Sequence, residues 1–237
     1  MKHWDGQEIR ALALEKVLKP LWLRRGEFLP KGESSPLALL PISLDLVVTK
    51  LLGLRLEIPP EIIPDAGPHP LAGYQIAGLL DRELGRIVIA EKFPIACRRY
   101  TGFHEVGHHF LHPEVMYHRD RPVIGSERAD VRGRPRVEIE ADTFSAEVLM
   151  PRQLVLDLFL KRYGGTMSPD KIDETVAYRL SKRAEQELTV DMLVKGPRRG
   201  RSRLFAMDSL PGRSLTEIFL VSPAAMAIRL EELGLVL

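Results

Sequence analysis

FHEVGHHF, residues 103–110, carries His104, Glu105 and His108 in the spacing HExxH. On an α-helix, residues four positions apart lie on one face, so both imidazoles can bind one metal ion. Glu105 lies beside the metal position, where its carboxylate can take a proton from a water molecule. The spacing therefore predicts a helix over 94–112 that carries two zinc ligands and a general base.

A third ligand is expected in the segment EIEAD, residues 138–142, which begins 30 residues after His108. The surrounding pattern VEIEADTFSAEVLM predicts a helix over 136–149. Glu138 and Asp142 are one helical turn apart, so Glu138 can complete the metal site while Asp142 orients a histidine ligand. Glu140 is the competing ligand, and we favour Glu138 because only Glu138 pairs with Asp142 in this way. The ligand set predicts one zinc ion per chain.

The neighbouring histidines are not expected to bind the metal. His112 lies one turn beyond His108, too far along the helix axis to share the ion easily, and is expected to cap the helix end. His109 faces elsewhere and is expected to be structural. A histidine six residues beyond His108 would indicate a metzincin, but Glu114 occupies that position.

Composition and charge exclude several classes of protein. The chain has 34 Lys and Arg against 32 Asp and Glu, and a net charge of +2 argues against a bulk polyanion binder. Its single cysteine, Cys97, excludes a disulfide framework and indicates a reducing compartment. Because no run of 18 uncharged apolar residues and no secretory signal is present, we expect a cytoplasmic protein with no membrane partner.

Periodicity and turn residues predict the other elements. Helices are expected over 5–19, where Pro20 ends the helix, over 43–53, and near 152–162, 168–187, 213–220 and 223–233. A short strand is expected over 54–58 and a hairpin from 74–80 and 86–90, one strand of which is expected to be the exposed edge that pairs with a substrate peptide. The basic segment 195–203 is expected to be a flexible loop.

The motifs TGFHEVGHHFLH and EIEADTFSAEVLMP resemble the ImmA/IrrE family of metallopeptidases. The upstream segments PISLDLVVTKLLGL, AGLLDRELGRIVIA and RRYTGF are also similar to this family, so the likeness covers about 36–155. It implies an α+β fold with a zincin-like minimal peptidase domain, in which a small, mainly antiparallel sheet packs on the HExxH helix. It also implies that Glu138 is the third ligand. Ser145 stands where the family usually has Ala, and the loop 113–136 is unusually rich in Arg.

The resemblance divides the chain into an N-terminal helical extension, a peptidase domain and a C-terminal helical module, expected over 1–35, 36–160 and 161–237. Residues 214–234 resemble the helix-turn-helix-like tail that often follows this domain. Its second helix offers Arg229 as its one basic residue, so at most weak nucleic-acid contact is expected there.

The function that the resemblance implies is a zinc-dependent endopeptidase acting on a protein partner. That partner would be a helix-turn-helix transcriptional repressor in a stress-response or mobile-element circuit. Tyr117 and His118, in the loop after the HExxH helix, are candidate donors to the oxyanion of the reaction. The alternative is a DNA-associated or protein-binding regulator with a non-catalytic zinc site. We favour the peptidase because a structural zinc site has no use for Glu105.

Overall fold

The computed structural model describes residues 2–62, 76–114, 117–120, 135–168, 198–208 and 211–237. For 117–120 and 198–201 the description is limited to the backbone. The chain divides into two compact units, Met1–Leu149 and Met150–Leu237. The first unit combines helices with one small sheet and the second is helical, which confirms the predicted α+β class.

The sheet of the first unit has the strand order β1-β3-β2-β4, with bounds Arg55–Glu57, Gly78–Asp81, Arg86–Ile89 and Tyr117–Asp120 for β1 to β4. β2 and β3 form the predicted antiparallel hairpin, whose turn contains Gly85 at φ +61°. β1 pairs with β3 in parallel and β4 pairs with β2 antiparallel. The expectation that a hairpin strand is the sheet edge is therefore wrong, because β2 and β3 each have partners on both sides.

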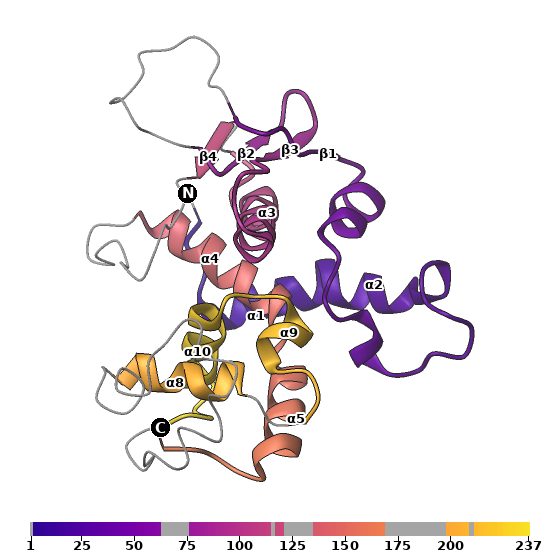
Figure 1. Cartoon of the computed structure of the whole chain (residues 1–237). Coiled ribbons are helices and arrows are strands. Elements are labelled where there is room, and N and C mark those ends of the chain that lie inside the picture. Colours follow the sequence, from indigo (N-terminus) through magenta and orange to yellow (C-terminus); the bar gives the residue numbers. More distant parts are fainter. Residues whose placement is uncertain (1, 63–75, 115–116, 121–134, 169–197, 209–210) are drawn as a thin grey trace. The chain divides into compact units, whose positions relative to one another are not determined.

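The HExxH helix, α3, spans Ile95–Leu111, and the EIEAD helix, α4, spans Arg136–Leu149. α3 contacts β2 and β3 on one side and α4 on the other, so it lies between the sheet and α4 (Figure 1). Ile87, Phe103 and Phe144 come from these three layers and are completely buried. Burying each such side chain contributes about 1.5–3 kcal/mol, which makes this stack the core of the unit.

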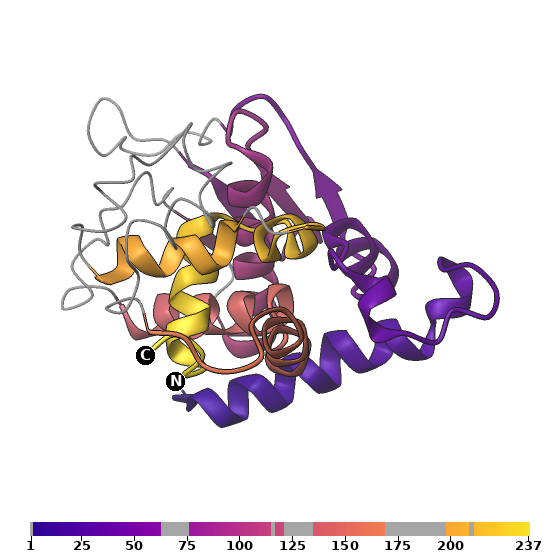
Figure 2. The ribbon, with the colours of Figure 1, turned by 60° about the horizontal axis from the view of Figure 1, so that its bottom comes forward.

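The N-terminal helix is longer than predicted. α1 (Gly6–Ala13), a π-helical segment (Leu14–Leu18) and α2 (Lys19–Leu23) run on as one rod (Figure 2). Pro20 does not end it, because the π-helical turn precedes Pro20 and places it in the first turn of α2, where no N–H is needed. α1 packs on α4. The side of the rod that is buried is lined by four residues at helical spacing, namely Ile9, Ala13, Val17 and Leu21.

Short helical segments connect this rod to the sheet. They are two 3₁₀ turns, Arg25–Glu27 and Pro36–Leu39, and a π-helical segment, Leu46–Leu51. The last of them confirms the helix predicted over 43–53. Ser43 caps its start by accepting the N–H of Leu46 at 3.3 Å, and Gly53 follows its end at φ +68°.

The second unit contains α5 (Arg152–Tyr163), α8 (Arg198–Met207), α9 (Leu215–Phe219) and α10 (Pro223–Glu232). Three of these helices were predicted, whereas the helix expected near 168–187 lies outside the described residues. α8 corrects the flexible loop expected over 195–203 for its described part, 198–203, because burial of Leu204 and Phe205 holds this segment helical, while 195–197 lie outside the described residues. Arg229 of α10 is buried and donates through Nε to the carbonyl of Met150 at 3.1 Å, so this cation is not on the surface.

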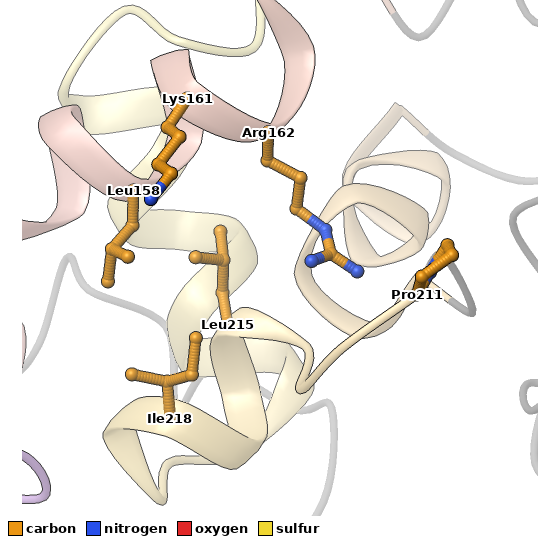
Figure 3. Close-up of a pocket in the computed structure, with 6 residues that line it drawn as sticks. All are labelled: Leu158, Lys161, Arg162, Pro211, Leu215 and Ile218. Atoms are coloured by element: carbon orange, nitrogen blue, oxygen red, sulfur yellow. The ribbon is translucent and has the colours of Figure 1, made fainter.

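Leu158 and Arg162 of α5 and Leu215 and Ile218 of α9 line a shallow pocket with Lys161 and Pro211 (Figure 3). Beside it, the fully buried Asp208 accepts hydrogen bonds from Arg162 and Tyr163. Burial, together with this hydrogen bond to Asp208, raises the pKa of Tyr163 above its ordinary range. Among the helices that the structure describes, none is both long and apolar enough to cross a membrane.

Removing the buried carboxylate of Asp208 should destabilise the second unit. In Asp208→Asn, the Arg162 guanidinium loses its anionic partner, and breaking such a buried pair costs about 3 kcal/mol. Urea unfolding followed by circular dichroism measures the change, with Asp157→Asn, an exposed α5 residue, as the control. Equal unfolding midpoints for the two variants would show that the pair does not hold the unit together.

Candidate metal centre

Two helices build the site, and they approach each other closely where α3 carries Gly107. A Cβ atom at Gly107 would lie 3.1 Å from both the Cα and the carbonyl oxygen of Ala141, and 3.3 Å from the Cβ of Phe144. Ser145, where the resemblance led us to expect Ala, donates its hydroxyl to the carbonyl of Tyr100 at 3.0 Å. The small residues and this bond bring the backbone of α4 against that of α3.

This approach brings the side chains of His104, His108 and Glu138 together, with one ligand atom from each lying within 4.8 Å of the others. The Nε2 atoms of the two histidines are 2.9 Å apart. Glu138 Oε2 lies 3.3 Å from His104 Nε2, and Glu138 Oε1 lies 3.8 Å from His108 Nε2. Both imidazoles are buried, whereas Glu138, in the first turn of α4, is partly accessible.

The donor set fits a zinc ion. His104 Nδ1 lies 2.9 Å from Asp142 Oδ1, and a carboxylate can only accept, so Nδ1 carries the proton. In a neutral ring this leaves the lone pair on Nε2, facing the second histidine and the Glu138 carboxylate. Three electron-pair donors thus converge, and two imidazoles with one carboxylate are a ligand set of catalytic zinc sites. Asp142, predicted to orient a histidine ligand, lies within hydrogen-bond distance of a histidine of the cluster.

Glu105 is completely buried on α3, where β2 covers its carboxylate. A Cβ atom added to Gly78, the first residue of β2, would lie 3.1 Å from Glu105 Oε1 and 2.3 Å from Thr101 Cγ2. Only a glycine allows the strand to pass this close. The sheet therefore fixes the carboxylate that the sequence predicts to be the general base.

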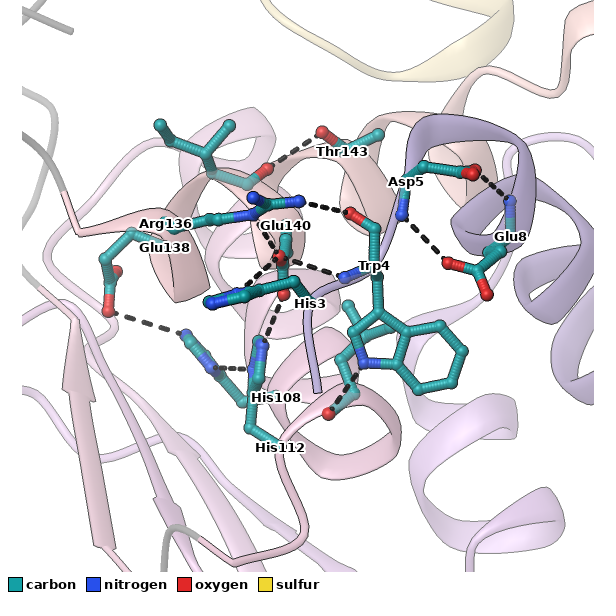
Figure 4. Close-up of polar contacts among 12 residues, drawn as sticks. His3, Trp4, Asp5, Glu8, His108, His112, Arg136, Glu138, Glu140 and Thr143 are labelled. Atoms are coloured by element: carbon teal, nitrogen blue, oxygen red, sulfur yellow. Dashed lines mark hydrogen bonds and ion pairs between the residues drawn. The ribbon is translucent and has the colours of Figure 1, made fainter. Parts of the chain in front are cut away.

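Glu140 lies apart from the metal-binding cluster and contacts His112 instead. Its Oε2 is 3.0 Å from His112 Nε2, and its Oε1 accepts from Arg136 and from the backbone N–H of Trp4 (Figure 4). Burial acts to raise the pKa of Glu140, but these hydrogen bonds outweigh it and hold the pKa below its ordinary range. Glu138 is thus the glutamate of the EIEAD segment that faces the two histidines.

His112 ends α3 as predicted, with its backbone N–H donating to the carbonyl of His108 at 3.1 Å. No contact between its side chain and a metal ligand was predicted, yet that side chain is completely buried with Nδ1 3.0 Å from His108 Nδ1. The available signal was its position, one helical turn beyond a ligand. Tyr117 and His118 lie in strand β4 rather than in a loop, and their side chains are outside the description.

Arg82, in the hairpin turn after β2, is a second group that the sequence analysis missed. Its guanidinium donates to three carbonyls at the end of α3, those of His108 at 2.8 Å, His109 at 3.2 Å and His112 at 3.1 Å. A cation at this end of a helix bonds to the terminal carbonyls and offsets the helix dipole. Burial lowers the pKa of Arg82. Burial also lowers the pKa of His109, and the positive charge of Arg82 lowers it further.

The sequence model of the IrrE N-terminal-like domain family (Peptidase M78) matches residues 67–181, a segment that contains α3 and α4 with the whole metal-binding cluster. A search of curated proteins gives no significant match.

Replacing Gly107 with alanine should separate the two helices and weaken metal binding. The added Cβ meets backbone atoms of α4 that cannot rotate away, so we expect a loss of stability of about 1–3 kcal/mol. Because Glu138 moves with α4, zinc affinity should fall as well. Thermal unfolding and competition with a chromogenic chelator measure the two effects.

The matched control for this substitution is Gly6→Ala, also on a helix, where a Cβ atom would meet nothing within 4 Å. This variant should leave stability unchanged or slightly higher, because alanine favours the helix over glycine. Wild-type stability and zinc affinity in Gly107→Ala would contradict the role given to the close helix approach.

Proposed function

Residues 67–181 belong to the IrrE N-terminal-like family of zinc metallopeptidases, and on this premise we propose that the chain is a zinc-dependent endopeptidase. One observation carries the proposal, namely that His104, His108 and Glu138 converge, while the residue that follows His104 on the same helix, Glu105, is a completely buried carboxylate. A purely structural zinc site needs its ligands alone, whereas a hydrolase also needs a proton acceptor beside them. We propose that each chain binds one zinc ion.

In this proposal His104, His108 and Glu138 hold the zinc ion, which when bound polarises the scissile carbonyl and lowers the pKa of water. Glu105 accepts a proton from the attacking water molecule and later donates it to the nitrogen of the leaving amine. Asp142 keeps the proton of His104 on Nδ1, so that Nε2 stays available as a ligand. Gly78 lets β2 close over Glu105 and keeps its carboxylate in place.

We place the substrate peptide along β4, an edge strand of the described sheet. β4 pairs with β2 in a register that sets Asp120 opposite Gly78, the residue that lies against Glu105. A peptide that adds to this edge gains backbone hydrogen bonds, which bind an extended chain without strict sequence demands. As the substrate class we propose a protein partner, namely a helix-turn-helix repressor in a regulatory circuit, which the family resemblance suggests.

The Glu105→Gln variant should bind zinc with wild-type affinity and lose hydrolysis. Glutamine keeps the size of the side chain and all three ligands but cannot accept the proton, which costs about 10²–10⁴-fold in rate. Cleavage of a proteome-derived peptide library, followed by mass spectrometry of new amino termini, measures activity. Elemental analysis measures zinc.

The control variant His108→Ala should lose both zinc and cleavage, because it removes a ligand. Together the two variants separate the chemical step from metal binding. Full turnover by Glu105→Gln would overturn the assignment of Glu105 as the general base.

A further inference from the structure

Behind His108 lies a line of polar side chains that the proposed mechanism does not use. His112 Nδ1 is 3.0 Å from His108 Nδ1, and His112 Nε2 is 3.0 Å from Glu140 Oε2. All three side chains are buried, with 1%, 0% and 3% exposure for His108, His112 and Glu140. They form a continuous connection from a carboxylate to a metal ligand (Figure 4).

The protons of this connection can be arranged in one way when both rings are neutral. A carboxylate only accepts, so His112 Nε2 carries a proton and donates it to Glu140. The other nitrogen of His112, Nδ1, is then an acceptor, and His108 Nδ1 must donate to it. This leaves the lone pair of His108 on Nε2, the atom that faces His104 and Glu138.

The N-terminal segment holds the far end of this connection. The backbone N–H of Trp4 donates to Glu140 Oε1 at 3.2 Å, and Arg136 donates to the same oxygen at 2.9 Å. Arg136 also donates to the carbonyl of Trp4 at 3.4 Å, and the Trp4 indole donates to the carbonyl of Leu111 at 3.0 Å. Trp4 thus bonds to both helices of the metal centre.

We propose that Glu140 and His112 are positioning residues for the metal ligand His108, and that Trp4 holds Glu140 in place. The proposal rests on the metal centre of the proposed function. His104 has a carboxylate, Asp142, in direct contact, whereas His108 has its carboxylate one histidine further away. Partners of this kind fix the orientation and tautomer of a ligand histidine, and their loss costs about 10–100-fold in metal affinity.

The deciding comparison is Glu140→Gln against Glu147→Gln in the full-length chain. Both glutamates are on α4, have 3% and 4% exposure, and bind an arginine, Arg136 for Glu140 and Arg10 for Glu147. We expect Glu140→Gln to weaken zinc binding about tenfold or more, because glutamine offers no anion to His112, and Glu147→Gln to leave it within about twofold. Competition with a chelator measures both, and equal zinc affinities would overturn the proposal.

A second pair of variants separates positioning from packing. His112→Phe fills the buried space without an acceptor for His108, whereas in His112→Gln the amide can accept from His108 and donate to Glu140. We expect His112→Phe to lose zinc affinity about 10–100-fold and His112→Gln to recover most of it. The absorption bands of bound Co²⁺ should shift in His112→Phe and return toward wild type in His112→Gln. Failure of glutamine to restore either readout would contradict the proposal.

The role of Trp4 is tested by combining substitutions. Trp4→Ala keeps the backbone N–H that bonds to Glu140 but removes the indole that anchors this segment to the carbonyl of Leu111. It should therefore weaken zinc binding several-fold in the wild-type chain and hardly further in Glu140→Gln, because the loosened segment acts on the metal ligand through the Glu140 carboxylate. Trp22→Ala, at the other tryptophan of the chain, is the control and should leave zinc affinity unchanged. Additive losses from Trp4→Ala and Glu140→Gln would overturn the coupling between Trp4 and Glu140.

These measurements can contradict the positioning residues without contradicting the proposed function, and the reverse also holds. Zinc affinities that follow the expected order in a chain that cleaves no peptide would support the positioning residues and contradict the peptidase. Peptide cleavage by a chain in which Glu140→Gln and Glu147→Gln bind zinc equally well would support the peptidase and overturn the positioning residues.

Discussion

The close contact between α3 and α4 at Gly107 is the constraint on which the metal centre depends. HExxH supplies two ligands from one helix, but the third ligand must come from another element that reaches the same point. At Gly107 a Cβ atom would lie only 3.1 Å from backbone atoms of α4, so a larger residue would push the two helices apart. Glu138 and Asp142, one turn apart on α4, then both face His104.

The sheet meets the opposite side of α3 in a similar way. Gly78 removes the side chain that would collide with Thr101 and Glu105, so β2 can lie directly over the Glu105 carboxylate. Gly107 thus sets the distance between α3 and α4, and Gly78 sets the distance between α3 and the sheet. Gly107 sets how closely Glu138 approaches the two histidines, and Gly78 sets how closely β2 covers the Glu105 carboxylate.

Features that depend on residues close together in the sequence could be predicted, whereas features that depend on residues far apart in the sequence could not. The HExxH helix, the EIEAD helix and the hairpin depend on local periodicity and turn residues, and their positions were predicted closely. Pro20 was misread because a π-helical turn before it, which no residue pattern marks, lets the rod continue. The sheet edges were misassigned because β1 and β4 are short and pair with strands distant in sequence. The side chain of His112 was missed because its partner Glu140 lies on another helix.

The bonds of Trp4 have a consequence for how the protein is made. Trp4 and Glu140 are separated by 136 positions, and Trp4 and Leu111 by 107. During synthesis, Trp4 leaves the ribosome well before Glu140 and must therefore wait for α4 before it finds this partner. Contacts of such long sequence separation form late and slow folding. The candidate metal centre can consequently be completed only after α4 has been translated.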